Sequence, residues 1–341
     1  MFSFFKSSPK GIQVNDLSIE IEAKETILTA ALRSGLNFPY SCKVGGCAEC
    51  KCKLTRGKIK ALTDASYLLS AEELQDGYIL ACQSIPKSSD VSIEVDLSRA
   101  ASRQMRGKIT AQKQITHDIR KLELTLEESP VFKAGQYAQL TLDSLPGVTR
   151  AYSFASKPDA ESNTVSFFIR HVPGGEMSAL INTQDLIGQS AEIESPKGDF
   201  YLRDSDKPML MIAGGSGLAP IVSILEKAKE ENCTRPVTII LGARTQADIY
   251  CLHEIAEIGH NWPNRFEYVQ ILSEEPEGSS WQGLRGFIGD HLERFSKQQS
   301  QGYLCGPPVM IDDCIERLSN MGISKDDIFA DRFVTIITKA A

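Results

Sequence analysis

The spacing of apolar and polar residues changes twice along the chain and divides it into three zones. The first zone, 11–96, holds short apolar runs around a group of cysteines. In the second, from 106 to about 203, apolar and polar residues alternate between turn signals, which predicts antiparallel strands. The third, 207–341, alternates short apolar strands with helical patterns, which predicts βαβ units and a parallel sheet. We therefore expect a first domain, a linker, an antiparallel β domain and an α/β domain, at 11–97, 98–105, 106–204 and 205–341.

Within the third zone, the pattern also predicts individual elements. Proline suits the first turn of a helix, so Pro307 and Pro308 are expected to open one. The other expected elements are strands at 209–213, 237–242, 266–272 and 303–305 and helices at 219–230 and from Asp248.

Composition and charge narrow the class of protein. Of the 341 residues, 42% are hydrophobic and 24% charged, as in a globular protein of two or three domains. The net charge of −7 argues against nucleic-acid binding, which depends on basic patches. The uncharged stretch 208–225 contains prolines and glycines, so strand, turn and helix are expected there instead of a membrane span. We expect no signal peptide and no integral membrane segment, and a monomer is the default expectation.

Four of the nine cysteines have the spacing of a metal site. Cys42, Cys47 and Cys50 follow the pattern C-x4-C-x2-C, and Cys82 comes after 31 further residues. This is the plant-type [2Fe–2S] spacing, in which one loop supplies three thiolates and a distant segment supplies the fourth. Zinc is the alternative, although zinc loops usually come as two short-spaced pairs. The odd number of crowded cysteines indicates a reducing cytoplasm and not a disulfide scaffold.

Other residues among the first 60 have two interpretations each. Cys52 could compete as a fifth ligand, but a small packed residue in a strand at 51–54 is the simpler interpretation. The Phe2, Phe4 and Phe5 side chains could touch a membrane-bound partner, but a frayed terminus is simpler. The nearby basic residues form either a solvated surface or a docking face for an acidic partner. They are Lys43, Lys51, Lys53, Arg56, Lys58 and Lys60.

Two motifs in the second zone suit a flavin. On a predicted strand, Arg150 can pair with a pyrophosphate, Tyr152 can pack against a flat ring, and Ser153 can hydrogen-bond a ring nitrogen. The stretch 170–178 joins a glycine-rich turn to a helical pattern, whose free N–H groups can hold phosphate. An ordinary strand or hairpin is the alternative for either motif alone, but their combination favours the flavin.

A second nucleotide is indicated in the third zone. A glycine-rich loop follows an apolar strand and opens a helix, which lets the backbone approach a diphosphate. Its glycines are Gly214, Gly215 and Gly217. The loop departs from the Rossmann pattern, because Pro220 replaces the third glycine and Arg244 stands where an acid is expected. Cys305 and Gly306 end a later strand, where ligands of α/β sheets bind, although Cys305 could equally be a small core residue.

Together, these motifs resemble those of the ferredoxin–NADP reductase superfamily with a plant-type ferredoxin fused at the N-terminus. More narrowly, the chain resembles the reductase components of bacterial aromatic-hydroxylating oxygenases, of the xylene monooxygenase and naphthalene dioxygenase types. The resemblance covers residues 11–335. It implies a β-grasp [2Fe–2S] ferredoxin domain, an antiparallel β-barrel FAD domain and a parallel-sheet α/β domain for the nicotinamide nucleotide.

The resemblance also implies roles for single residues. Ser153 and Cys305 would lie at the reacting rings, and the four cysteines named above would hold the cluster. FAD contacts are implied for Arg150, Tyr152, Ser153, Arg170, Val172, Gly174, Gly175, Met177 and Ser178. Nicotinamide-nucleotide contacts are implied for Gly214, Gly215, Ser216, Gly217, Pro220, Arg244, Asp248, Cys305 and Gly306, and Phe333 would lie near the flavin.

The implied activity is electron transfer from NADH through FAD and the cluster to a terminal oxygenase. A flavin accepts hydride and releases single electrons, which suits this order. In the Rossmann fold, an arginine at the place of Arg244 accommodates the 2′-phosphate of NADPH. Relatives with the pattern G-A-R-x-x-x-D, however, mostly prefer NADH. The oxygen chemistry is expected on another polypeptide, because the five histidines are too scattered for a Rieske or di-iron site. The alternatives are a reductase for a non-oxygenase such as a deoxysugar dehydratase, and a redox carrier or sensor with a vestigial flavin half.

Overall fold

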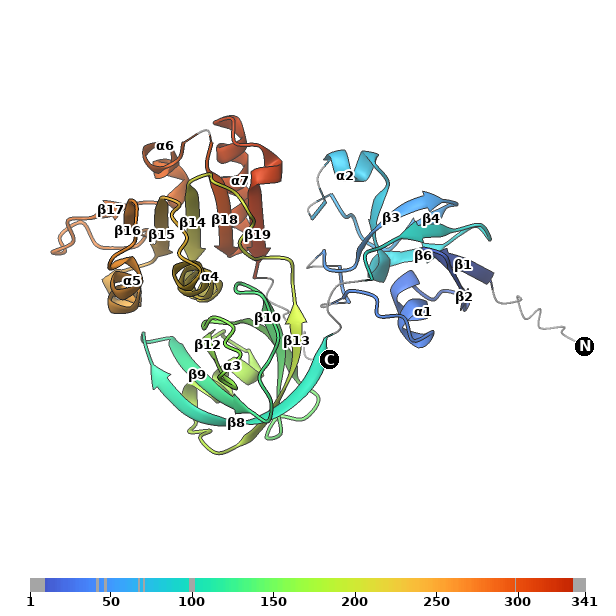
Figure 1. Ribbon diagram of the computed structural model, residues 1–341, viewed down its shortest axis with the longest axis horizontal. Coiled ribbons are helices and arrows are strands. Elements are labelled where there is room, and N and C mark those ends of the chain that lie inside the picture. The colour runs from blue at the N-terminus through green and yellow to red at the C-terminus, as the bar shows by residue number, and fades with distance from the viewer. Residues whose placement is uncertain are drawn as a thin grey trace, which may run out of the picture. The chain divides into compact units, whose positions relative to one another are not determined.

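The computed structural model describes residues 10–40, 43–45, 48–66, 68–69, 71–97, 102–297 and 299–333. The chain divides into two compact units, residues 1–101 and 102–341 (Figure 1). Cys42, Cys47 and the phenylalanine-rich start lie outside the described residues, as do residues 98–101 of the expected linker. None of the described helices has the length and apolar content that a bilayer span requires.

The first unit is the expected β-grasp arrangement, a mixed sheet that packs against a helix. Its strand order is β2-β1-β7-β3-β5, in which β1 and β7 are parallel and the other pairs antiparallel. The apolar core between sheet and helix includes Cys52, which is 1% exposed and therefore packed as the simpler interpretation predicted. The elements are β1 Lys10–Val14, β2 Leu17–Ile21, α1 Ile27–Arg33, β3 Lys51–Arg56, β4 Ile59–Ala61, α2 Ala71–Gln75, β5 Tyr78–Leu80, β6 Ser84–Pro86 and β7 Ser92–Glu94.

The second unit begins with six antiparallel strands in the order β11-β10-β13-β8-β9-β12. An isolated antiparallel bridge between Phe154 and Phe167 brings the edge strands together, as a barrel requires. Along β13, every second residue is buried, which is the alternation that the sequence shows. The elements are β8 Arg103–Gln114, β9 Ile119–Leu126, β10 Tyr137–Leu142, β11 Thr149–Ser153, β12 Thr164–Arg170, α3 Glu176–Thr183 and β13 Ser190–Lys197.

The start of β8 corrects one expectation. Residues 103–105 were expected in the linker, but they pair with β13, where Arg103 lies opposite Ser195 and Met105 opposite Ile193. Met105 is 6% exposed in the barrel core. The strand forms here despite its weak local pattern because it pairs with a strand about ninety residues away in the chain.

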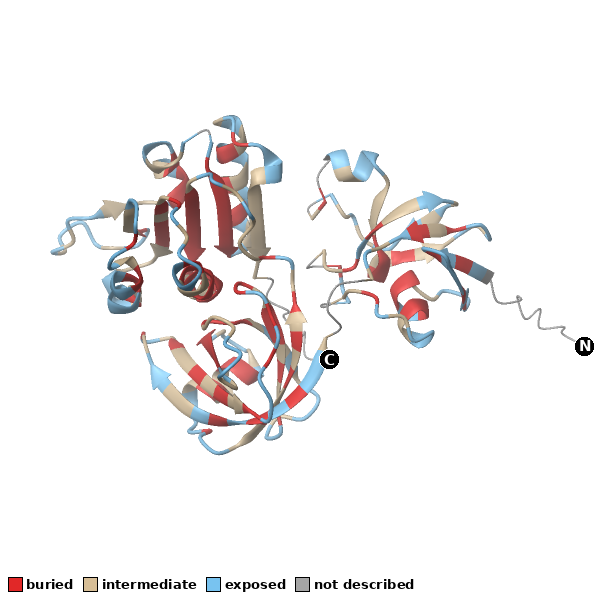
Figure 2. Cartoon of the chain, viewed as in Figure 1, coloured by how far each residue is buried: buried red, intermediate tan, exposed pale blue. Residues whose placement is uncertain are grey.

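The remainder of the second unit is the expected parallel sheet, with the order β17-β16-β15-β14-β18-β19. All six residues of β14 and of β18 are buried, as expected for central strands covered on both faces (Figure 2). The elements are β14 Met209–Gly214, α4 Leu218–Glu230, β15 Val237–Ala243, α5 Leu252–Gly259, β16 Phe266–Leu272, β17 Leu284–Arg285, α6 Leu292–Phe295, β18 Gln301–Gly306, α7 Pro308–Asn320 and β19 Ile328–Arg332.

The helix expected from Asp248 is a second correction. The chain first makes a short 3₁₀ turn, Gln246–Asp248, in which Thr245 and Asp248 form a capping box. Cys251 then adopts a left-handed backbone with φ of 55°, and α5 begins only at Leu252. The apolar pattern located the helix correctly. Its start is later than expected because Asp248 belongs to the capping box of the preceding turn.

The barrel and the parallel sheet share one apolar core. Helices α4 and α5 cover the face of the sheet turned toward the barrel, and α6 and α7 cover the other face (Figure 1). Phe168 of the barrel lies in the same cluster as Leu218 of α4. The Ser223 hydroxyl donates to the Ser156 carbonyl at 2.7 Å and joins the two domains further. Among the described residues, every apolar cluster lies wholly within one of the two units.

Candidate functional site

Two of the four predicted cluster ligands meet in the first unit. Cys50 and Cys82 are both buried, and the backbone N–H of Cys82 donates to Cys50 Sγ at 3.4 Å. The Gln83 amide donates to Cys82 Sγ at 3.6 Å. Gly45 has φ of +77°, and a Cβ there would lie 2.7 Å from the Gln83 side chain. Converging thiols with N–H donors on a glycine-shaped loop fit a [2Fe–2S] cluster.

The predicted flavin strand is β11, which carries Arg150, Tyr152 and Ser153. Arg150 donates only to the neighbouring Thr149 carbonyl and pairs with no carboxylate among the described residues. Tyr152 follows on the same face of the strand, and burial raises the pKa of its phenol, which stays neutral. Ser153 is 6% exposed, and its hydroxyl bonds no described side chain. An unpaired guanidinium beside a flat ring and a hydroxyl fits FAD.

The glycine turn before α3 is organised by Ser178. The Val172 N–H donates to Ser178 Oγ at 3.1 Å, and a Cβ at Gly175 would lie 2.7 Å from that oxygen. Gly174 has φ of +75°, and the side chain of Met177 is buried in the barrel core. Because these side chains are engaged, the groups that this turn can offer a phosphate are the backbone N–H groups at the start of α3.

The two glycine motifs of the third zone lie against each other at the carboxyl ends of β14 and β18. A Cβ at Gly217 would lie 2.2 Å from the Cys305 carbonyl oxygen, and one at Gly214 would lie 2.7 Å from the Pro307 ring. The Phe333 N–H donates to the Gly306 carbonyl at 2.9 Å. Three segments that are distant in sequence therefore meet where α/β sheets bind nucleotides.

The side chains of this loop region differ in accessibility. Ser216 is half-buried, whereas Pro220 is buried in the first turn of α4. Cys305 is fully buried, and burial raises the pKa of its thiol well above the usual range. The thiol therefore stays protonated at neutral pH and serves as a packing group, not as a nucleophile.

An ion-pair cluster joins the barrel to the parallel-sheet domain. Asp118 Oδ2 accepts from Arg170 Nε and from Arg244 Nη2, each at 2.9 Å. Arg244 Nη2 also donates to Asp248 Oδ1 at 2.9 Å. The His117 ring lies between the two carboxylates, 3.7 Å from Asp248 and 4.0 Å from Asp118. Sequence reasoning assigned Arg170, Arg244 and Asp248 to ligands but gave Asp118 no role.

Both carboxylates of this cluster titrate below their usual range. Burial alone would raise the pKa of Asp118, but the hydrogen bond and the charge of Arg170 outweigh it and lower the pKa. For Asp248, burial is likewise outweighed, by hydrogen bonds from the Thr245 backbone and from Arg244. These ion pairs therefore stabilise the fold fully above about pH 5, and the contribution is lost as the pH falls through about 4 and below.

The Asp248→Asn variant tests this pH dependence. We expect its free energy of unfolding to vary less between about pH 5 and pH 3 than that of the unchanged chain, because one depressed carboxylate no longer titrates. Urea titrations at a series of pH values measure the difference. Parallel pH profiles for the two proteins would contradict the assignment.

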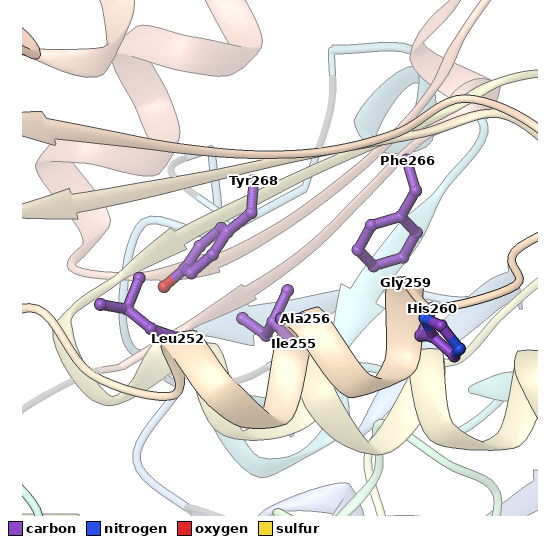
Figure 3. Close-up of a pocket in the computed structure, with 7 residues that line it drawn as sticks. All are labelled: Leu252, Ile255, Ala256, Gly259, His260, Phe266 and Tyr268. Atoms are coloured by element: carbon purple, nitrogen blue, oxygen red, sulfur yellow. The ribbon is translucent and has the colours of Figure 1, made fainter.

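A cavity of about 360 Å³ lies elsewhere, between α5 and β16 (Figure 3). It is lined by Leu252, Ile255, Ala256, Gly259, His260, Phe266 and Tyr268. None of these residues belongs to the predicted motifs, and the cavity lies along the helix flank instead of at the strand ends. We therefore place the site at the strand ends and not in this cavity.

Three family models match successive stretches of the chain. They are described as a 2Fe-2S iron-sulfur cluster binding domain at 12–87, an oxidoreductase FAD-binding domain at 106–201 and an oxidoreductase NAD-binding domain at 211–316. These matches agree with the order in which the cysteine, flavin and nucleotide motifs occur. They support a cluster, FAD and a nicotinamide nucleotide as cofactors.

Curated relatives and a solved structure are similar over nearly the whole chain. The xylene/toluene monooxygenase electron transfer component XylA of Pseudomonas putida is 38% identical over 330 residues, covering 96% of this chain and 93% of that protein. The phenol 2-monooxygenase reductase component DmpP of Pseudomonas sp. strain CF600 is 35% identical over 328 residues, covering 93% and 92%. The crystal structure of the Amycolatopsis cytochrome P450 reductase GcoB has a TM-score of 0.74 at 31% identity and covers 95% of this chain and 98% of that one. The chain belongs to the ferredoxin-fused reductases of the ferredoxin–NADP reductase superfamily.

Proposed function

We propose that this protein is the reductase component of a multicomponent aromatic or hydrocarbon oxygenase, and that it takes electrons from NADH. The observation that carries the proposal is the combination, in one chain, of three features: the meeting of Cys50 and Cys82, an Arg150 on the flavin strand that pairs with no carboxylate among the described residues, and a packed glycine loop at the nucleotide end. A carrier with a vestigial flavin half would have no reason to retain the last two. We place the protein in the cytoplasm, since clustered metal-binding thiols suit a reducing compartment. A monomer is the default expectation for its oligomeric state.

In this proposal, the residues of the chain act by positioning. FAD, when bound, supplies the change from two-electron to one-electron transfer. Arg150 would pair with the pyrophosphate, and the Ser153 hydroxyl would hydrogen-bond the flavin ring. The loop Gly214–Gly217 would bring the dinucleotide to the strand ends. There, the backbone of Cys305 and Gly306 packs against the loop. No acid or base among these residues is required, because hydride transfer depends on alignment.

The surroundings of Arg244 support NADH over NADPH. Its guanidinium is bound by both Asp118 and Asp248, and so its charge is already compensated. A third carboxylate, Glu275 in the segment after β16, accepts from the Gln246 backbone N–H at 2.8 Å. A 2′-phosphate would meet these carboxylates, whereas a ribose hydroxyl can donate to one of them.

The acceptor is inferred from the relatives. Two of them are named as components of xylene/toluene and phenol monooxygenases, and an aromatic O-demethylase reductase subunit from Amycolatopsis sp. strain ATCC 39116 / 75iv2 is 33% identical over 332 residues. These systems share an aromatic substrate. Because the relatives are named as components or subunits of these systems, we infer a terminal oxygenase on a separate polypeptide. NADH-driven hydroxylation by the mixed, purified proteins tests this inference.

An anaerobic titration tests the reductase itself. We expect NADH to bleach the flavin absorption band and to raise a rhombic [2Fe–2S] signal in electron paramagnetic resonance, and NADPH to require a higher concentration for the same change. Iron and sulfide content, measured on the same sample, is the control. Protein that contains iron and sulfide but is reduced by neither nucleotide would contradict the reductase function and favour a carrier or sensor.

A further inference from the structure

The turn between β8 and β9 carries a carboxylate that reaches the other domain of the second unit. Thr116 Oγ1 donates to Asp118 Oδ1 at 3.0 Å, and the Ile119 N–H donates to the same threonine, so the turn holds the carboxylate in place. The side chain of Asp118 is 15% exposed. Its ion pairs with Arg170 and Arg244 are therefore partly shielded from water and from salt.

Charges within this cluster are balanced. Two arginines, Arg170 and Arg244, face two carboxylates, Asp118 and Asp248, and the separations are all 2.9 Å. His117 adds a positive charge only when protonated. With neutral histidine, no cationic charge of this cluster remains uncompensated, including that of Arg244, which the Rossmann comparison places near a 2′-phosphate.

We propose that Asp118, although it belongs to the flavin-binding barrel, is a specificity-determining residue for the nicotinamide nucleotide. It holds Arg244 in a compensated pair across the domain border and so withholds that charge from a 2′-phosphate. In the Rossmann scheme, by contrast, this selection rests on a residue of the nucleotide domain itself. The inference rests on the proposed NADH preference and names the residue that enforces it.

The Asp118→Asn variant tests this role. The amide keeps the shape of the side chain and can still accept a hydrogen bond from Arg170, but the cluster gains a net positive charge. We expect the affinity for NADP⁺ to rise about tenfold and that for NAD⁺ to change less than about threefold, since one half-buried negative charge is removed near the phosphate. Calorimetric titration of the flavin-loaded protein measures both dissociation constants, and the gain should shrink as salt is added.

Two control variants separate charge from structure. Asp118→Glu restores the negative charge and should restore the preference for NAD⁺. Asp143 pairs with Arg106 at 2.7 Å on the same barrel, and both side chains are about half exposed, so Asp143→Asn removes a comparable ion pair away from the site and should leave both affinities unchanged. Equal weakening of both nucleotides in Asp118→Asn, or an unchanged ratio, would overturn the proposal.

Titration of the unchanged chain with NAD⁺ and NADP⁺ tests the proposed NADH preference by itself. If the unchanged chain already binds NADP⁺ more tightly than NAD⁺, the proposed NADH preference is wrong. The ratio between Asp118→Asn and the unchanged chain is a separate result, because it measures only the effect of the Asp118 charge on the two nucleotides.

Discussion

Replacing Cys82 by serine is expected to abolish electron delivery to one-electron protein acceptors while leaving flavin reduction intact. Cys82 lies in the buried core of the first unit beside Cys50, and its backbone and sulfur are already held by neighbouring groups. Removing a ligand should cost more than the roughly 100-fold that changes in the outer shell of a metal site cost. Cytochrome c reduction by NADH measures this loss, and ferricyanide reduction reports the flavin half alone.

Cys52 provides the matched control. It is buried in the same core, on β3, and burial raises the pKa of its thiol to about 12, so it is a neutral packing group. Cys52→Ser should therefore retain the cluster absorption and most of the cytochrome c activity. Loss of the cluster in Cys52→Ser, or retention of it in Cys82→Ser, would show that the ligand set is different from the one proposed.

Gly217→Ala should destroy the nucleotide site and weaken the second unit. The added Cβ would lie 2.2 Å from the Cys305 carbonyl oxygen and 2.6 Å from its carbon, both of them backbone atoms that cannot move aside. Such overpacking costs about 3 kcal/mol, and any relief must separate β18 from the start of α4. We expect a lower midpoint in urea unfolding and no reduction of the flavin by NADH.

Gly278 is suited to the control for this substitution. A Cβ there meets nothing within 4 Å, and its backbone has no positive φ, so Gly278→Ala should change neither stability nor nucleotide binding. If Gly217→Ala retained both the unfolding midpoint and the NADH reaction, the close approach of the two glycine motifs would be refuted.

The sequence was sufficient for the features that depend on neighbouring residues. Continuous apolar runs located β14 and β18, because central parallel strands are buried on both faces. Glycines and prolines located the loops at their ends, because few other residues fit such turns. The cysteine spacing likewise predicted the 2Fe-2S domain that the family model matches at 12–87, because that spacing is typical of such domains.

Features that depend on partners distant in the chain could not be predicted. Asp118 and Arg244 are 126 residues apart and belong to different domains, and nothing in the local pattern links them. The Cys305 side chain is buried in an apolar cluster with residues of β14 and α4, which the local sequence does not reveal, and so the sequence left open whether it faced a ligand. The start of β8 at Arg103 likewise depends on pairing with Ser195.

The separation of the apolar clusters has a consequence for how such proteins diversify. Because the described core of the first unit consists entirely of its own residues, a gene rearrangement within 98–101 would exchange the ferredoxin domain together with that core. A break near 204 would instead divide the cluster that Phe168 and Leu218 share and leave both halves prone to aggregation. Recombination is thus expected to preserve the flavin and nucleotide domains as a single inherited block and to vary the ferredoxin domain.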